Sequence, residues 1–217
     1  LQLARRSLTL PVLATIGTGA VVFAGSGAFL AWEMAQGGYL SAHQAEQLRA
    51  DYEQRYHRTA FLPQPRITAV RLDTAIHPAA RALQVKGSYQ LENRTSRPLS
   101  DVVLYQQRGA RLNVTFTQPA TLAASDPERG FYRYRLATPM APGARMGLDF
   151  TVDYAPRGLL GLGSETPVVG NGTFFTNDVM PRIGYQPAVE LRDERDRRRH
   201  GLAPRARMAA RDDPAAR

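Results

Sequence analysis

Side chains that commonly catalyse reactions or bind metals are sparse in this sequence of 217 residues. It contains no cysteine, which excludes disulfides, thiol nucleophiles and thiolate metal sites. A zinc hydrolase helix of the H-E-x-x-H type needs two imidazoles one turn apart with a glutamate between them as general base, and that motif is missing. We therefore interpret the four histidines as structural or solvated side chains: His43, His57, His77 and His200.

Glycine-rich segments do not supply a phosphate-binding loop either. "GTGAVVFAGSG" lies inside an apolar stretch, and "GLGSET" lacks both a third glycine and a following helix. No G-x-S-x-G motif appears, and no nucleophile has a recognisable base beside it. The sequence therefore predicts no catalytic, cofactor-binding or metal-binding residue in this chain.

The net charge of +9 comes almost entirely from arginine, since Lys86 is the only lysine among 28 basic residues. These arginines are spread along the chain and form no single stripe, which argues against a nucleic-acid partner. The segment "VELRDERDRRRHGLAPRARMAARDDPAAR" at the end mixes nine arginines with six acidic residues. We interpret it as a solvated helix and loop.

An uncharged stretch of 26 residues, from Ser7 to Trp32, is the clearest element of the sequence. As a helix it would extend about 39 Å against a hydrocarbon core of about 30 Å, so it can span a bilayer with tilt. Arg5 and Arg6 precede it, and Glu33 follows it. The positive-inside rule then predicts a cytoplasmic N-terminus and places everything after about residue 35 outside the cytoplasm.

This apolar stretch allows other interpretations. "RRSLTL" followed by an apolar run resembles a twin-arginine export signal, although the run is long for a signal peptide. Small residues recur every fourth position at Ala20, Ala24 and Ala28, a spacing that lets helices approach closely in lipid. Other transmembrane helices are therefore expected partners, and the alternative is a lone anchor that is merely rich in alanine and glycine.

Residues 36–65 are predicted to hold a charged juxtamembrane helix and a linker. In "SAHQAEQLRADYEQRYHR", Ser41 and Gln44 can form a capping box. Asp51 lies four residues before Arg55, the spacing of an intrahelical ion pair. The two prolines of "LPQP" end this helix.

Residues 66–156 change to a period of two, which predicts about six antiparallel strands with one apolar face each. The cleanest is "RMGLDFTVDY", in which every second residue from Met146 to Tyr154 is apolar. We expect a mainly β fold, an antiparallel β-sandwich or curved sheet, preceded by one transmembrane helix within residues 1–35.

Residues 157–217 are predicted to form a loop-rich extension with a short strand and a charged helical tail, continuing into a missing downstream domain. Its segment "NGTFFTNDVMPRIGYQ" carries five large apolar side chains, which should pack over the open side of the β-domain or against the domain that follows: Phe174, Phe175, Val179, Met180 and Ile183. Part of that surface is expected to lie uncovered. The chain begins with Leu and ends in an Ala/Arg/Pro-rich run, so we expect a piece of a larger protein.

The order of these motifs resembles one bacterial architecture, an ABC-transporter-type permease fused to a C-terminal aminopeptidase N-like (gluzincin) metallopeptidase domain. The resemblance is carried by a span ending in "AW", then "DYEQRYHR", "PQPRITAVRLDTAIHPAARALQVKGSYQLENRTSRPL", "NGTFF", "PRIGYQ" and "RRRHGL". It covers nearly the whole chain, from the last membrane helix into the N-terminal β-domain of the peptidase-like part.

This resemblance implies a bacterial plasma-membrane protein whose zinc is bound by an H-E-x-x-H helix and a more distant Glu, with a G-x-M-E-N loop for the substrate's amino terminus, all downstream of Arg217. Zinc is expected only in that missing domain. The implied partners are the lipid bilayer, other transmembrane helices, the downstream peptidase-like domain and an ATPase subunit. The alternatives are a non-enzymatic extracytoplasmic module that binds a peptide or protein, and a free-standing single-span adhesion or scaffold protein.

Overall fold

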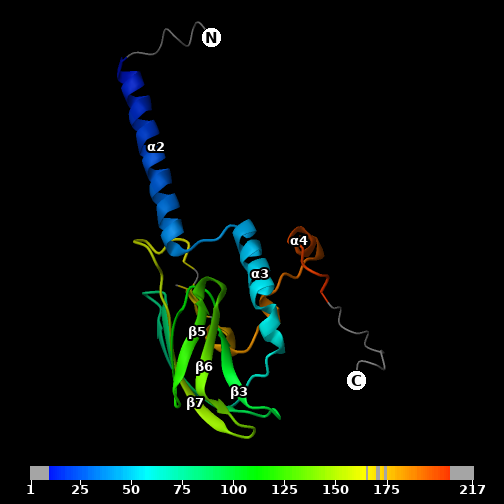
Figure 1. The fold of residues 1–217 in the computed structure, drawn as a ribbon. Coiled ribbons are helices and arrows are strands. Elements are labelled where there is room, and N and C mark those ends of the chain that lie inside the picture. Colours follow the sequence, from blue (N-terminus) through cyan, green and yellow to red (C-terminus); the bar gives the residue numbers. More distant parts are fainter. Residues whose placement is uncertain (1–9, 165, 170–171, 174, 206–217) are drawn as a thin grey trace.

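The computed structural model describes residues 10–164, 166–169, 172–173 and 175–205. They form one long apolar helix, a second helix, and a mainly β region built from antiparallel sheets (Figure 1). The long helix points away from the sheets, and the second helix lies along one side of them (Figure 1).

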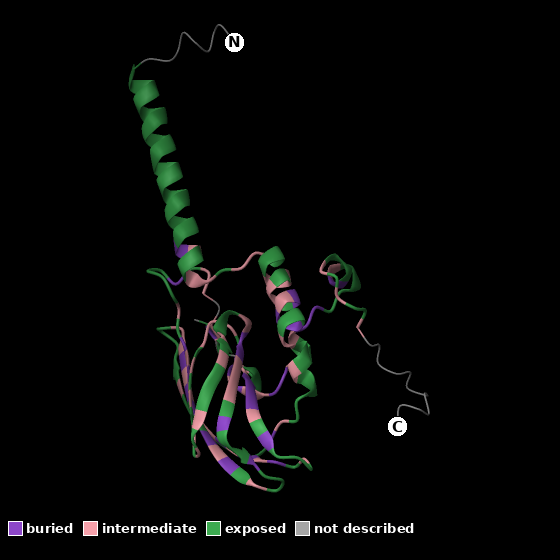
Figure 2. Ribbon diagram, in the orientation of Figure 1, coloured by how far each residue is buried: buried purple, intermediate pink, exposed green. Residues whose placement is uncertain are grey.

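The long helix, α2 (Leu10–Gly37), is exposed along almost its whole length (Figure 2). Its length and composition are those of a helix that can cross a membrane. It ends because Gly38 takes a left-handed conformation (φ 81°), and the Tyr39 N–H then donates to the Met34 carbonyl. The helix continues beyond the predicted end at Trp32, whereas residues 1–9, with the predicted flanking arginines, lie outside the described residues.

The second helix, α3 (Ala42–Tyr56), confirms the predicted capping box, since Ser41 and Gln44 each bond the other's backbone N–H. A short 3₁₀ turn, η1 (His57–Phe61), follows it. The predicted pair between Asp51 and Arg55 is wrong. Asp51 instead accepts a hydrogen bond from Arg129, because its face of α3 packs on the 3₁₀ turn η2 (Pro127–Arg129) while Arg55 stays exposed.

Two four-stranded antiparallel sheets make up most of the β region. The first has the order β1-β2-β7-β4, with β1 (Arg66–His77), β2 (Ala82–Glu92), β7 (Arg145–Tyr154) and β4 (Arg111–Phe116). The second has the order β10-β3-β6-β5, with β10 (Arg182–Ile183), β3 (Leu99–Tyr105), β6 (Phe131–Met140) and β5 (Ala120–Asp126). A small hairpin joins β8 (Val168–Val169) to β9 (Gly172–Thr173).

One hydrophobic core contains buried residues of both large sheets, among them Leu148 and Val152 of β7 and Val102 and Leu104 of β3. Every second residue of β7 from Met146 is buried, which confirms the predicted strand. β5 is an additional strand that the sequence did not predict, because "ATLAASD" offers only small apolar residues and one leucine.

The segment after β7 contributes to this core. Val179, in the turn η3 (Asn177–Val179), is buried, and Phe175, Met180 and Ile183 pack partly buried against it, as predicted; Phe174 lies outside the described residues. Further on come η4 (Pro187–Val189) and α4 (Glu194–Arg199). The prediction of a solvated tail is wrong for Arg197, which is buried because it folds back onto α3.

The edge strand β1 presents an uncovered apolar face. Val70, Leu72 and Ile76 stand opposite Tyr89, Gly87 and Leu83 of β2, so they lie on the side of the sheet that faces the core. They are nevertheless 53%, 43% and 42% exposed. The second sheet therefore leaves the inner face of β1 open.

Candidate functional site

The carboxylate of Glu33 joins the end of α2 to a loop far along the chain. Glu33 is fully buried, and the N–H groups of Leu159 and Leu160 donate to its two carboxylate oxygens, the first at 2.9 Å. We call residues 157–164 the junction loop. Because a buried carboxylate is stable only when hydrogen bonds replace its water, these donors hold the loop against the helix.

Two glycines make this close approach possible. A Cβ atom on Gly37 would overlap the carbonyl oxygen of Leu162, and one on Gly158 would lie 2.5 Å from the Glu33 Oε1 atom. Gly158 also has a φ of 80°, which side chains rarely adopt. The helix end and the junction loop therefore fit together only with glycine at both positions.

The junction loop adds apolar surface at the end of the apolar helix. Leu159 is 77% exposed and Leu160 is 57% exposed, while their backbone N–H groups bind Glu33. Trp32, the neighbour of Glu33 in α2, is also exposed. These large apolar side chains are therefore exposed beside a helix whose length and composition would allow it to cross a membrane.

A buried ion pair attaches α3 to the C-terminal segment. The Arg197 guanidinium donates to both carboxylate oxygens of Glu53, at 2.6 and 2.9 Å, and their side chains are only 4% and 9% exposed. Arg197 also donates to the carbonyl oxygens of Leu191 and Ala203. The guanidinium thus has partners in three directions, which compensates for its removal from water.

Aromatic rings complete this attachment. Tyr52 of α3 stacks on Tyr185 at a centroid distance of 5.0 Å, and its hydroxyl accepts a hydrogen bond from the Gln186 N–H. The Tyr185 hydroxyl donates to Glu190 at 2.9 Å. Burial, and then the contact with the Glu190 carboxylate, raises the pKa of Tyr185, so this hydroxyl stays a donor at neutral pH.

One group of side chains has the composition of a metal site. Glu53, His57 and Glu190 each bring a ligand atom within 4.8 Å of the others. Both oxygens of Glu53 already bind the buried guanidinium of Arg197, and Glu190 accepts from Tyr185. A metal ion would therefore have to displace a buried cation or lie beside it, and the geometry favours an ion-pair network.

The sequence did not indicate this cluster, because only two of its three residues are close together in the chain. Glu53 and His57 are one helical turn apart, but Glu190 joins them from 133 positions after His57. Of the other histidines, His43 and His77 are exposed, and the Nε2 atom of His200 lies 2.9 Å from Glu46. The exposure of His43 and His77 agrees with the prediction of solvated side chains, whereas the partners of His57 and His200 could not be predicted.

Taken together, the described residues define a β-rich domain attached to one long apolar helix. No family model matches the chain, and no curated protein matches it. Among solved structures, it is similar to an M1 zinc metallopeptidase from Deinococcus radiodurans and to a mutant two-domain M1 zinc metallopeptidase bound to L-tryptophan. In each case the identity is 18%, the match covers 43% of this chain and 21% of the other, and the TM-score is 0.35. The matched region is thus about a fifth of those enzymes, and it assigns no activity.

We expect Glu33→Ala to release the junction loop. Without the carboxylate, the Leu159 and Leu160 N–H groups lose charge-assisted hydrogen bonds, and their exchange with solvent should accelerate by more than about tenfold. Hydrogen–deuterium exchange of the full chain in detergent measures this. Glu92→Ala, which removes a carboxylate paired with Arg94 and Arg145 on the sheet, is the control. Unchanged exchange in the junction loop would contradict the assignment.

Arg197→Ala should lower the free energy of unfolding by about 3 kcal/mol, because it leaves the Glu53 carboxylate buried without its partner. Arg198→Ala is the matched control, since the neighbouring side chain is exposed, and it should change stability by no more than about 0.5 kcal/mol. Denaturant unfolding of the full chain measures both. Equal effects of the two variants would show that the pair does not attach the C-terminal segment.

Zinc should not bind stoichiometrically to Glu53, His57 and Glu190, because Arg197 holds the first of these carboxylates. The measurement is the metal content of the full chain after equilibration with zinc and dialysis. One zinc ion per chain, lost in His57→Ala and retained in His43→Ala, would overturn the ion-pair interpretation.

Proposed function

We propose that this chain is the membrane-anchored, extracytoplasmic β-domain of a larger protein that resembles the permease–aminopeptidase fusions. In this proposal α2 spans the membrane, α3 packs along one side of the sheets, and the β-domain stands beside a zinc aminopeptidase-like domain outside this chain. The observation that carries it is the exposed apolar α2, fixed to the sheets through the buried Glu33.

The arrangement of apolar surface supports a neighbouring domain. The inner face of β1 is open, and a groove of about 750 Å³ runs from it to the segment after β9, with Val70, Tyr89, Met180 and Ile183 in its walls. Apolar surface of this kind is normally covered by another domain or partner. A downstream peptidase-like domain is the occupant that the proposed architecture supplies.

The membrane part of the proposal concerns the surface of α2. α2 is exposed on all sides. Its small residues Ala20, Ala24 and Ala28 would allow close packing with further transmembrane helices in lipid. Such spans would belong to a permease, and an ATPase subunit would be its partner on the cytoplasmic side. This chain would then contribute mechanical coupling between the membrane and the outer domain, with no hydrolysis of its own.

A non-enzymatic binding module is the second candidate, and the same groove favours it, because an open apolar groove can accept a peptide. The coding sequence downstream of Arg217 discriminates between the two. An H-E-x-x-H motif with a distal Glu favours the peptidase, and a peptidase-like domain without these residues favours the binding module.

Cysteine labelling tests the proposed topology cleanly, since the chain has no cysteine of its own. Arg71→Cys on β1 should react with a membrane-impermeant maleimide in intact spheroplasts. Gln2→Cys, in the N-terminal segment, should react only after the membrane is permeabilised. The reverse pattern would contradict the orientation, and recovery of the chain in the soluble fraction would contradict the span.

A further inference from the structure

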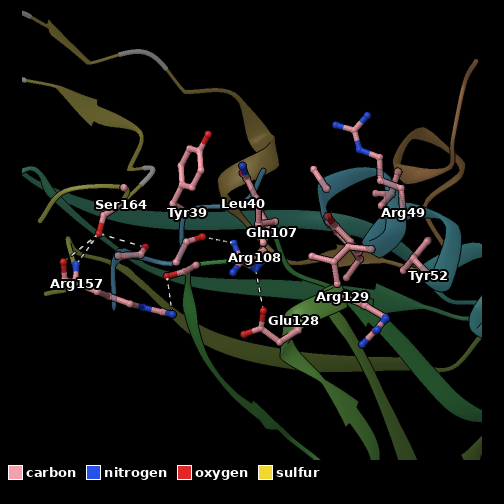
Figure 3. A pocket seen from close by; sticks show the side chains of 18 of the residues that line it. Tyr39, Leu40, Arg49, Tyr52, Gln107, Arg108, Glu128, Arg129, Arg157 and Ser164 are labelled. Atoms are coloured by element: carbon pink, nitrogen blue, oxygen red, sulfur yellow. Dashed lines mark hydrogen bonds and ion pairs between the residues drawn. The ribbon is translucent and has the colours of Figure 1, made fainter. Parts of the chain in front are cut away.

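A pocket of about 300 Å³ lies where α2 meets the β-domain. Its walls come from the linker after α2, from α3, from the chain between β3 and β4, from η2 and from the junction loop. Four arginines line it: Arg49, Arg108, Arg129 and Arg157. Figure 3 shows Arg108 and Glu128 in the middle, with Arg157 on one side and Arg49 and Arg129 on the other.

The positive charges of this pocket are only partly compensated. Glu128 is the only acidic residue among the described lining residues, and it pairs with Arg108 at 2.9 Å. Arg129 forms ion pairs with Asp51 and Asp126, neither of which lines the pocket. Within the described part of the chain, Arg49 has no acidic partner, and neither does Arg157.

The two uncompensated arginines differ in how they are held. The Arg157 guanidinium donates to the Gly109 carbonyl at 3.3 Å, and the Arg157 backbone N–H donates to the Ser164 hydroxyl at 2.8 Å (Figure 3). These two hydrogen bonds position the Arg157 side chain. Arg49 projects from α3, and its side chain is exposed. Guanidinium groups present several donors in a plane, which suits the oxygens of a phosphate group.

The position of the pocket at the end of α2 indicates which kind of molecule would supply that phosphate group. If α2 spans the bilayer, its segment from Leu10 to Trp32 is about 33 Å long, because each residue of an α-helix adds about 1.5 Å. This length is close to the hydrocarbon thickness of about 30 Å. The linker from Gly37 to Leu40, which lines the pocket, then lies at the level of the lipid headgroups. Leu159 and Leu160 are exposed at the same end of the helix, where acyl chains begin.

We propose that this pocket binds the headgroup of an anionic phospholipid, with Arg157 and Arg49 as charged ligands on its two sides and Leu159, Leu160 and α2 against the acyl chains. This inference rests on the proposed membrane span of α2. The lipid would fill the space between the helix end and the β-domain and add a charge-assisted contact to the attachment made by Glu33.

The test uses the purified full chain in detergent, with phosphatidylglycerol, phosphatidylcholine or inorganic phosphate as the probe. Native mass spectrometry of the lipid adducts gives apparent dissociation constants. The chain should bind phosphatidylglycerol more tightly than phosphatidylcholine, and Arg49→Gln with Arg157→Gln should weaken that binding by at least about tenfold, as expected for the loss of hydrogen bonds to a charged group.

The matched control is Arg55→Gln with Arg71→Gln, which removes the same charge from exposed positions on α3 and β1 outside the pocket lining. Equal loss of binding in both double variants would overturn the proposal, as would equal affinity for the two lipids. Displacement of the lipid by inorganic phosphate at comparable affinity would assign the pocket to free phosphate instead. Because Arg49 and Arg157 are exposed, both double variants should keep the unfolding midpoint of the unmodified chain.

Failure of this inference is distinguishable from failure of the proposed function. Cysteine labelling reports the membrane span without any dependence on lipid identity. A spanning chain that shows no lipid preference would contradict the lipid site alone.

Discussion

The burial of one carboxylate at the end of an apolar helix is the interaction on which the rest of this arrangement depends. A charged carboxylate that leaves water needs hydrogen bonds in place of its hydration, and backbone N–H groups supply them to both oxygens of Glu33. Those donors belong to the loop that follows β7, an interior strand of the first sheet. These hydrogen bonds attach the end of α2 to the β-domain through the junction loop.

The helix α3 is attached by a different principle. It has few large apolar residues, so its contacts with the domain are mostly polar and aromatic: Glu53 binds Arg197, Asp51 binds Arg129, Glu46 lies beside His200, and Tyr52 stacks on Tyr185. Arginine supplies the guanidinium partners of Glu53, Asp51 and Glu46, and at Glu53 its planar fork binds the carboxylate through two hydrogen bonds. A composition biased toward arginine is therefore used structurally at these positions, although it forms no continuous basic surface.

The elements with strong local signals could be predicted from the sequence, and the contacts between distant segments could not. The uncharged run, the capping box at Ser41 and the alternation of β7 each follow from a few neighbouring residues. β5 was missed because small side chains give little periodic signal. The partners of Glu33, Asp51 and Arg197 lie 78 to 144 positions away, and nothing in their local spacing identifies them. The candidate site consists mainly of such long-range contacts, which is why the sequence indicated no site there.

The open inner face of β1 lies over residues that are already held in place. Tyr89, which stands opposite Val70, is buried and donates its hydroxyl to the Pro181 carbonyl at 3.1 Å, so the floor of the groove is held in place. A surface that is already ordered loses little conformational entropy when it is covered. Long exposed edge strands also invite pairing with other chains, and proteins normally cover or charge them. β1 carries charges at Arg66, Arg71 and Asp73 but keeps its inner face apolar, and in the proposed architecture a domain that remains bound would cover that face.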